Sequence, residues 1–379
     1  MTGDEHSSTH PPLPPTTEDD RFDRLRLLRS RRVGPATYWR LLSEHGGASA
    51  ALDVLPSLAQ RAGVNDYSPC SAERARAELE AGRRLGAKLL FRGEAPYPPL
   101  LAELEDAPPI LWMRGRADLL DRPMLAMVGA RNASSLGTRM ARGLAGELGA
   151  AGYTLVSGLA RGIDAIAHDA ALPTGTLAVV AGGVDVIYPS ENAALHERIA
   201  TEGVILSEQP IGLAAQARHF PARNRIVSGL CPATIVVEAA ARSGSLITAR
   251  TALDQGREVF AVPGHPLDPR ASGCNALLRD GATLVRNGSD VIEALAPPQS
   301  RPAQTDMVLE PTEPPRRPLR RVAGLHRRIL DRLGAAPVAE DQLIRDLRAP
   351  SRDVGSALTE LELDGAITRQ PGGLLARSM

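Results

Sequence analysis

Six short apolar runs decide the fold: LAMVGA (125–130), YTLVSG (153–158), TLAVVAGG (176–183), GVILSE (203–208), ATIVVEA (233–239) and EVFAVPG (258–264). Most end in glycine or another small residue, and a segment able to form a helix or crossover follows each run. Such runs are typical of strands buried on both faces of a parallel sheet. Right-handed crossovers then predict an α/β, doubly wound, Rossmann-like domain with a mostly parallel sheet. Its ligand is expected outside the carboxyl ends of the strands.

The segments on either side of these runs predict further domains. We expect a disordered tail (1–20), a small helical domain (21–85), the extended Rossmann-like domain (86–295), a proline-rich linker (296–321) and a winged helix (322–379). Within the helical domain, the turn 32–35 (RVGP) resembles the hairpin of a helix-hairpin-helix or SAM-like module, whose glycine lets backbone amides face a phosphate. A turn that only links two helices is the interpretation we prefer.

The last domain has the pattern of a winged helix. Helices are expected over 325–333 and 338–347, and a third begins at Ser351, whose hydroxyl can cap it, and ends at Gly365. Two short strands around 371–373 complete the pattern. The third helix carries the acids Asp353, Glu360, Glu362 and Asp364. Because acids repel phosphates, we favour a protein-contact or structural role for this domain over recognition of a DNA sequence.

Composition excludes several classes of protein. The 379 residues include 44 basic and 44 acidic side chains, so an anionic partner must be held by a local cluster of cations. Lys88 is the only lysine, and it stands outside any GxxxxGK[ST] motif, which excludes a P-loop ATPase. Three scattered cysteines argue against a disulfide framework or a zinc site. No apolar run reaches the about 18 residues of a membrane span, and we expect a cytoplasmic protein.

The loop after the first run carries an anion-binding pattern. It reads GARNASSLG over 129–137, where a dinucleotide fold keeps GxGxxG. Arg131 replaces the glycine that would admit a pyrophosphate, so NAD and FAD are disfavoured and no cofactor is expected. In this loop, which begins at Gly129, free amides at a helix N-terminus, the Arg131 guanidinium and the Ser134 hydroxyl all suit an anion. A solvated helix with a tight turn is the alternative.

The loop after the second run, SGLARGIDAIAH (157–168), adds Arg161 at the same sheet edge. Asp164 and His168 share a helix face, but with no nucleophile nearby a helix-start hydrogen-bond network is favoured over a catalytic pair. Asp185 and Glu238 follow later strands and are interpreted as acids that fix loops.

Two further segments suit single-stranded nucleic acid. One is the loop FPARNR (220–225), in which an aromatic ring accompanies cations, as bases and phosphates require. Its candidate residues are Phe220, Arg223, Asn224 and Arg225. A buried phenylalanine with surface arginines is the alternative. The other segment is SGSLIT (243–248), where Ser243 and Gly244 open a helix whose amides can meet phosphate.

Together these loops resemble the DNA processing protein A (DprA, or Smf) family. The strings GARNASSLG, SGLARGIDAIAH, GGVDVIYPSEN, FPARNRIVSGL, VVEAAARSGSLITARTALDQGREVFAVPG and SGCNALLRDGA span residues 129–282 in the family's order. The helical N-terminal domain and the winged helix look like the family's additions to its central domain.

The resemblance implies a non-enzymatic protein that binds and protects incoming single-stranded DNA in natural transformation, forms a homodimer and loads RecA recombinase. The family's loop arginine falls on Arg131 with Ser134 at its hydroxyl position, and its FxxRNR motif falls on 220–225. Relatives often place lysines along the DNA track. Here arginine must replace them, which suits phosphate equally well.

Two alternative hypotheses assign the protein to other functional classes. The first is a nucleotide-processing enzyme resembling the phosphoribohydrolases, but these need PGGxGTxxE where this chain reads EAAARSGSLITA, so Glu238 precedes the small-residue loop instead of following it. The second is a regulator that binds duplex operators through the winged helix, which the acids of its third helix disfavour. The apolar pair Leu277-Leu278 and the segment 292–295 are candidates for the dimer or RecA surface.

Overall fold

The computed structural model describes residues 14, 15, 17–296, 319–334, 337–370 and 373–378. The chain forms two compact units, Met1–Pro297 and Pro298–Met379, and each is described by itself. The predicted tail lies outside the described residues except at its end. The predicted linker lies outside them over 297–318.

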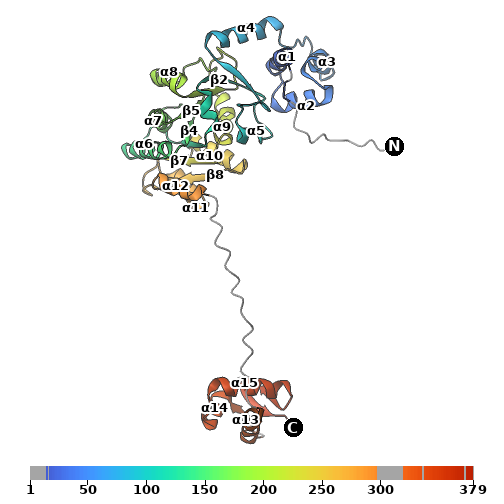
Figure 1. Ribbon diagram of the computed structural model, residues 1–379, viewed down its shortest axis with the longest axis vertical. Coiled ribbons are helices and arrows are strands. Elements are labelled where there is room, and N and C mark those ends of the chain that lie inside the picture. The colour runs from blue at the N-terminus through green and yellow to red at the C-terminus, as the bar shows by residue number, and fades with distance from the viewer. Residues whose placement is uncertain (1–13, 16, 297–318, 335–336, 371–372, 379) are drawn as a thin grey trace, which may run out of the picture. The chain divides into compact units, whose positions relative to one another are not determined.

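A nine-stranded sheet forms the centre of the first unit (Figure 1). Its strands are β1 (Lys88–Phe91), β2 (Ile110–Gly115), β3 (Met124–Val128), β4 (Thr154–Ser157), β5 (Thr176–Val179), β6 (Val204–Ser207), β7 (Ala233–Val236), β8 (Glu258–Ala261) and β9 (Thr283–Leu284). Their order in the sheet is β1-β2-β6-β5-β4-β3-β7-β8-β9. The pairs β1–β2 and β2–β6 are antiparallel and all others are parallel, which confirms the predicted fold class.

The strand order reverses at β3. In register, Ala126 of β3 pairs with Val156 of β4 on one side and Thr234 of β7 on the other. The chain runs outward from β3 to β6 in one direction and from β7 to β9 in the other. In open α/β sheets, such a reversal opens a crevice at the carboxyl ends of the strands.

Helices cover both faces of the sheet (Figure 1). They are α5 (Pro99–Ala102), α6 (Ser135–Ala150), α7 (Ile163–Ala171), α8 (Ala193–Glu202), α9 (His219–Gly229), α10 (Gly244–Asp254), α11 (Ser272–Arg279) and α12 (Gly288–Leu295), with short 3-10 turns η1 (Ala117–Asp121) and η2 (Ser190–Asn192). Two separate clusters of buried side chains show the division. One joins α6, α7 and α12 to the sheet, and the other joins α5, α9, α10 and α11 to its opposite face.

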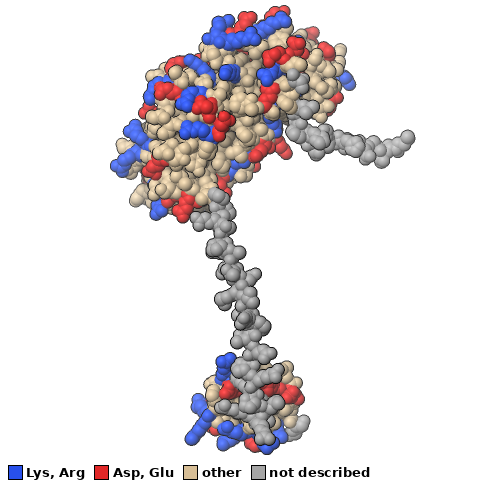
Figure 2. Space-filling model, viewed as in Figure 1, with Lys and Arg blue, Asp and Glu red and all other residues tan. Residues whose placement is uncertain are grey.

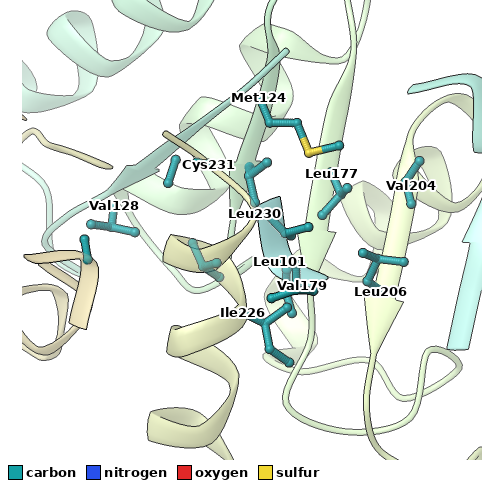
Figure 3. Close-up of a cluster of buried hydrophobic side chains, with 14 of the residues drawn as sticks. Leu101, Met124, Val128, Leu177, Val179, Val204, Leu206, Ile226, Leu230 and Cys231 are labelled. Atoms are coloured by element: carbon teal, nitrogen blue, oxygen red, sulfur yellow. The ribbon is translucent and has the colours of Figure 1, made fainter. Parts of the chain in front are cut away.

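Helix α9 is anchored to the sheet by its apolar side chains. Ile226 and Leu230 are buried in one cluster with Leu177 and Val179 of β5, and Leu101 of α5 lies beside them (Figure 3). Burial of side chains of this size contributes about 1.5–3 kcal/mol each. One side of α9 is therefore held against the sheet, and its other sides are left for polar contacts.

The helical N-terminal part packs into the same compact unit. It consists of α1 (Glu18–Arg29), α2 (Pro35–His45), α3 (Ala48–Arg61) and α4 (Ala72–Arg84), which we call the helical module. Helix α1 begins before the helical pattern read from Arg21, because the Thr17 hydroxyl accepts a hydrogen bond from the Asp20 amide at 3.1 Å and caps it. Pro35 occupies the first turn of α2, where its missing amide hydrogen costs nothing.

The second unit is a winged helix, as predicted. Its elements are α13 (Leu319–Arg332), β10 (Val338–Ala339), α14 (Glu340–Leu347), α15 (Ser351–Leu363), β11 (Ile367–Gln370) and β12 (Leu374–Arg377). The predicted cap at Ser351 is wrong: α15 begins there, Pro350 holds the capping position and no side chain caps the helix. The expected helix over 338–347 begins two residues later, because residues 338 and 339 pair with β12.

None of the helices in the described segments is long and apolar enough to cross a membrane. On the face that Figure 2 presents, basic and acidic side chains are interspersed over the first unit. A search for an anion site therefore has to compare individual arginines.

Candidate nucleic-acid interface

A cleft of about 790 Å³ opens at the carboxyl edge of the sheet, where the strand order reverses. The loops after β3, β4 and β7 and the first turns of α9 and α10 line it. Seven of the predicted site residues meet there: Gly129, Arg131, Phe220, Arg223, Asn224, Ser243 and Gly244. Four arginines line this cleft, at positions 131, 223, 242 and 270, against the single acid Asp164. The excess of cations suits an anionic ligand.

Arg131 is the exposed cation of the loop after β3. Within the described part of the chain no carboxylate pairs with it. Its guanidinium carbon lies 5.9 Å from the centre of the Phe220 ring, within the range of a cation–π contact. The arginine and the aromatic ring therefore present a cation and a π-face side by side.

Tyr188 extends this aromatic surface, and sequence reasoning missed it. Its ring centre lies 5.4 Å from that of Phe220, with the two planes tilted by 54°. Tyr188 is 51% exposed, so its ring is open to solvent. The sequence feature that indicates it is an aromatic residue in the loop after β5, within the string GGVDVIYPSEN.

Arg223 lies on the floor of the cleft. Only 6% of the residue is exposed, and Nη1 donates a hydrogen bond to the Val179 carbonyl oxygen at 3.0 Å. Burial lowers the pKa of Arg223 and the nearby Asp164 carboxylate opposes that shift. Gly158 is required here, because a Cβ at that position would overlap the guanidinium. The arginine contributes buried positive charge to the cleft.

Asp164 and His168 are structural. Asp164 accepts hydrogen bonds from the amides of Gly158 at 3.2 Å and Ala160 at 3.4 Å, which is the helix-start network expected from the sequence. His168 is fully buried, and its Nδ1 lies 2.7 Å from the Thr176 hydroxyl. Burial lowers the pKa of His168 to about 3, so the ring is neutral at pH 7. No hydrogen bond joins the two side chains in the described residues.

The sequence predicts free amides at the N-terminus of α6, but in the structure a carboxylate of the same chain bonds there. Glu238, two residues after β7, accepts hydrogen bonds from the Ser134 amide at 2.9 Å and from the Ser134 hydroxyl. Gly137 leaves the space for this carboxylate, since a Cβ there would overlap it. Ser134 also caps α6 by accepting from the Gly137 amide at 3.0 Å. Glu238 is thus a loop-fixing acid, as interpreted from the sequence, and it occupies the place expected for a phosphate.

The N-terminus of α10 is open by contrast. Ser243 caps the helix by accepting from the Ser245 amide at 3.3 Å, and the two hydroxyls lie 2.6 Å apart. No carboxylate contacts these groups among the residues described. Arg242, beside them, is exposed and lines the cleft, as does Arg270. Sequence reasoning did not select these two arginines, although Arg242 stands directly before the chosen Ser243.

Three predicted site residues lie outside the cleft. Ser134 faces a neighbouring pocket behind α6. Arg161 lines a small adjoining pocket with Tyr188 and pairs with Glu191 at 3.4 Å. Arg225 lies on the other side of α9, in a recess beside the helical module. The expected loop 220–225 is the first half of α9, and its helical turn separates Arg225 from Arg223.

Comparison with known proteins agrees with this architecture. The profile described as "DNA recombination-mediator protein A" matches residues 88–296. A "DprA-like N-terminal HHH domain" matches 18–81, and a "DprA winged helix domain" matches 311–373. The chain belongs to the DNA recombination-mediator protein A family. Protein Smf of Synechocystis is 34% identical over 78% of this chain and 81% of its own length.

Other relatives match between about half and three quarters of the chain. The DNA processing protein DprA of Streptococcus pneumoniae is 46% identical over 52% of this chain and 70% of that protein. A crystal structure of DprA from that organism superposes with a TM-score of 0.61 at 34% identity, covering 73% of this chain and 98% of that one. A structure of Helicobacter pylori DNA processing protein A, described by its single-stranded DNA binding mode, gives a TM-score of 0.51 at 33% identity, with 55% and 95% covered.

Proposed function

We propose that the cleft binds single-stranded DNA. The observation that carries the proposal is the Arg131 guanidinium beside the Phe220 ring, at the point where the strand order reverses. No carboxylate of the described residues pairs with this guanidinium. Arg131 and Arg242 contact phosphates from the rim, and Arg223 adds positive charge from the floor. The open N-terminus of α10 at Ser243 and Gly244 accepts a further phosphate. The single-stranded DNA binding mode described for the Helicobacter pylori relative supports this assignment.

Stacking explains a preference for single strands. A base can lie on the rings of Phe220 or Tyr188 only after it has left a duplex, and stacking of this kind contributes about 1–3 kcal/mol per base. Because every base has a π-face and phosphates carry no sequence information, binding is tolerant of sequence. It is also sensitive to salt, since each neutralised phosphate of a single strand changes the slope of log K against log salt by about 0.7.

We further propose that the protein is not an enzyme and acts by delivering DNA. In this role it protects incoming strands during natural transformation and loads RecA recombinase onto them as a homodimer. The family's description as a recombination mediator supports this role. A groove lined by Leu246, Leu253 and the predicted Leu277 supports the dimer, because Leu253 at its edge is 56% exposed. Light scattering should give twice the chain mass, and a monomer at all concentrations contradicts the dimer.

A titration at two salt concentrations tests the DNA site. We expect the wild type to bind a mixed-sequence single strand more tightly than its duplex. Arg131→Ala should lower the affinity about tenfold or more and reduce the salt slope by about 0.7, because a charge-assisted contact is worth about 1.5–3 kcal/mol. Arg142→Ala is the matched control. Arg142 is exposed on α6, outside the cleft, and loses the same charge.

The outcomes separate the proposals. Equal loss of affinity in the Arg131 and Arg142 variants would show a general charge effect and contradict the cleft. If the cleft is confirmed, RecA assembly on strands coated with a single-strand-binding protein tests the loading role. Wild-type protein should accelerate assembly and Arg131→Ala should not. An equal rate with and without the wild-type protein would contradict loading and leave the DNA site standing.

A further inference from the structure

We propose that Arg225 is a positioning residue: it fixes the rotation of α9 against the helical module, so that Phe220 and Arg223 face the cleft. This inference rests on the proposed DNA-binding function of the cleft. It differs from the sequence-based assignment of Arg225 as a DNA contact, and the two assignments predict opposite results for the variants described below.

Helical geometry separates the two arginines of the motif. Successive residues of an α-helix lie about 100° apart around its axis, so positions 223 and 225 lie about 160° apart. Arg223 accordingly lines the cleft with Phe220 and Asn224. Arg225 lines the recess beside the helical module, together with Ala222. One strand of DNA in the cleft cannot reach both guanidinium groups directly.

The contacts of Arg225 are already made within the protein. Its Nη2 lies 2.6 Å from the Glu208 carboxylate, and its Nη1 donates to the Asp106 carbonyl oxygen at 2.7 Å. The Asp106 carboxylate lies 3.6 Å from Nε, close enough for an ion pair, so both terminal nitrogens donate within the protein and the charge faces two carboxylates. Only 15% of the side chain is exposed. A phosphate could reach this cation only by displacing a partly buried ion pair.

Glu208 connects Arg225 to the helical module. It follows β6, and its backbone carbonyl oxygen accepts a hydrogen bond from Nη1 of Arg29, the last residue of α1, at 3.2 Å. Burial raises the pKa of Glu208, and the charges of Arg225 and Arg29 both oppose this rise. The two arginines therefore approach one residue from two sides, one from α9 and one from α1.

The helical module is itself held firmly at this point. Arg29 pairs with Glu78 of α4 through Nη2 at 2.8 Å and Nε at 3.0 Å. The indole nitrogen of Trp112, in β2, donates to the same carboxylate at 2.7 Å. Less than a tenth of either side chain in the Arg29–Glu78 pair is exposed. The module thus offers α9 a rigid support across the sheet edge.

Arg225 restrains the recess side of α9, while on the cleft side the bond from Arg223 Nη1 to the Val179 carbonyl oxygen holds the helix to β5. Ile226 and Leu230 hold the helix on the sheet through apolar contacts, which have no direction of their own (Figure 3). Gln255 of α10 donates to the Arg225 carbonyl oxygen at 2.9 Å. The directional side-chain bonds on the outer side of the helix come from Arg225. Losing them allows α9 to turn, which moves Phe220 away from Arg131 and Tyr188.

Salt dependence distinguishes positioning from contact. Arg225→Ala should lower single-strand affinity about tenfold and leave the salt slope at the wild-type value, because no phosphate contact is lost. A slope reduced by about 0.7 would overturn the proposal in favour of a direct contact. Arg225→Lys keeps the ion pair with Glu208 and should recover most of the affinity.

Glu208→Gln gives results of opposite sign. If Arg225 binds DNA, removing its internal partner frees the cation and strengthens binding. If Arg225 positions α9, the same change loosens the helix and weakens binding about threefold or more. Glu105→Gln is the matched control for loss of one negative charge, since Glu105 is an exposed acid of the same recess. Stronger binding in the Glu208 variant than in this control would overturn the proposal.

A double-mutant cycle locates the effect on α9. Arg225→Ala should couple with Phe220→Ala by at least threefold, because both act through one helix, and should be additive with Arg242→Ala on the far wall. Equal coupling to both, or to neither, would overturn positioning. Arg131→Ala is measured in parallel. If Arg131→Ala and Arg225→Ala both leave binding unchanged, the DNA site in the cleft is disproved. If Arg131→Ala lowers the affinity as expected and Arg225→Ala has no effect, only the positioning role is disproved.

Discussion

The cleft at the carboxyl edge of the sheet and the recess beside the helical module are both lined by arginines, but they differ in which of these have a carboxylate partner. In the cleft, Arg270 pairs with Asp268 at 3.3 Å. Arg131 and Arg242 in the cleft have no carboxylate partner among the described residues. Arg29 and Arg225 in the recess are paired with Glu78 and Glu208. The difference teaches that pairing, and not the number of arginines, marks where an external anion can bind.

The two helix N-termini at the sheet edge repeat this contrast. Glu238 occupies the N-terminus of α6, and none of the described carboxylates occupies that of α10. Both helices begin with a capping serine, so the capping residue alone does not distinguish them. Three further predictions test whether the paired groups support the fold while the unpaired ones bind DNA.

The largest effect is expected from breaking the pair on the recess side. Arg29→Ala leaves the buried Glu78 carboxylate without its cation, which should lower the free energy of unfolding by about 3–5 kcal/mol. Arg131→Ala should change it by no more than about 0.5 kcal/mol, as is usual for an exposed side chain. Urea denaturation of the two variants measures both. Similar losses would remove the distinction between the two regions.

An intermediate effect on the free energy of unfolding is expected when the pH falls, because His168 is buried in its neutral form. Because burial lowers the pKa of His168 from 6.5 to about 3, the unfolded state takes up a proton first as the pH falls. The stability that this neutral ring contributes is present above pH 6.5 and is lost as the pH falls towards 3. Between pH 7 and pH 5 the loss should be about 2 kcal/mol.

The His168→Gln variant isolates this contribution. Its free energy of unfolding, measured in urea at both pH values, should change by about 2 kcal/mol less than that of the wild type. The wild-type and variant curves should therefore converge as the pH falls. Parallel curves would mean that His168 is accessible to protons in the folded state.

The smallest effect separates the two capping serines. Ser134→Ala should cost about 1 kcal/mol of stability through the lost cap and leave the salt slope of DNA binding unchanged. Ser243→Ala should cost a similar stability and also weaken binding about threefold, since α10 faces the open cleft. Paired measurements of unfolding and binding check this. A larger loss of affinity in the Ser134 variant would mean that DNA displaces Glu238.

The sequence predicted the sheet and most of the cleft because both depend on local patterns. The strands are apolar runs, and the carboxyl ends of neighbouring parallel strands meet at one edge, so Arg131 and Ser243 could be placed together from residue order alone. The contacts that the sequence did not predict join residues far apart in the chain. Glu238 follows Ser134 by more than a hundred residues, and no pattern around either residue signals that they bond.

Helix α9 shows a second limit. Pro221 and the arginines around it read as a loop, because proline usually ends a helix. Here it stands in the first turn, where its missing amide hydrogen is tolerated. Once 220–225 is helical, Arg225 must point away from Arg223. The loop assignment is wrong, and the helical turn places Arg225 on the other side of α9 from Arg223.

The Glu238 carboxylate also limits what this fold can recognise. In a dinucleotide-binding domain the N-terminus of the helix after the first strand of the fold receives a pyrophosphate. Here the Glu238 carboxylate bonds to Ser134 at the N-terminus of α6. Because it belongs to the same chain, it competes with a phosphate for this position at a fixed effective concentration. Dilution or depletion in the cell cannot remove it. The domain thereby keeps the architecture of a nucleotide-binding fold and holds one of its own carboxylates at the N-terminus of α6.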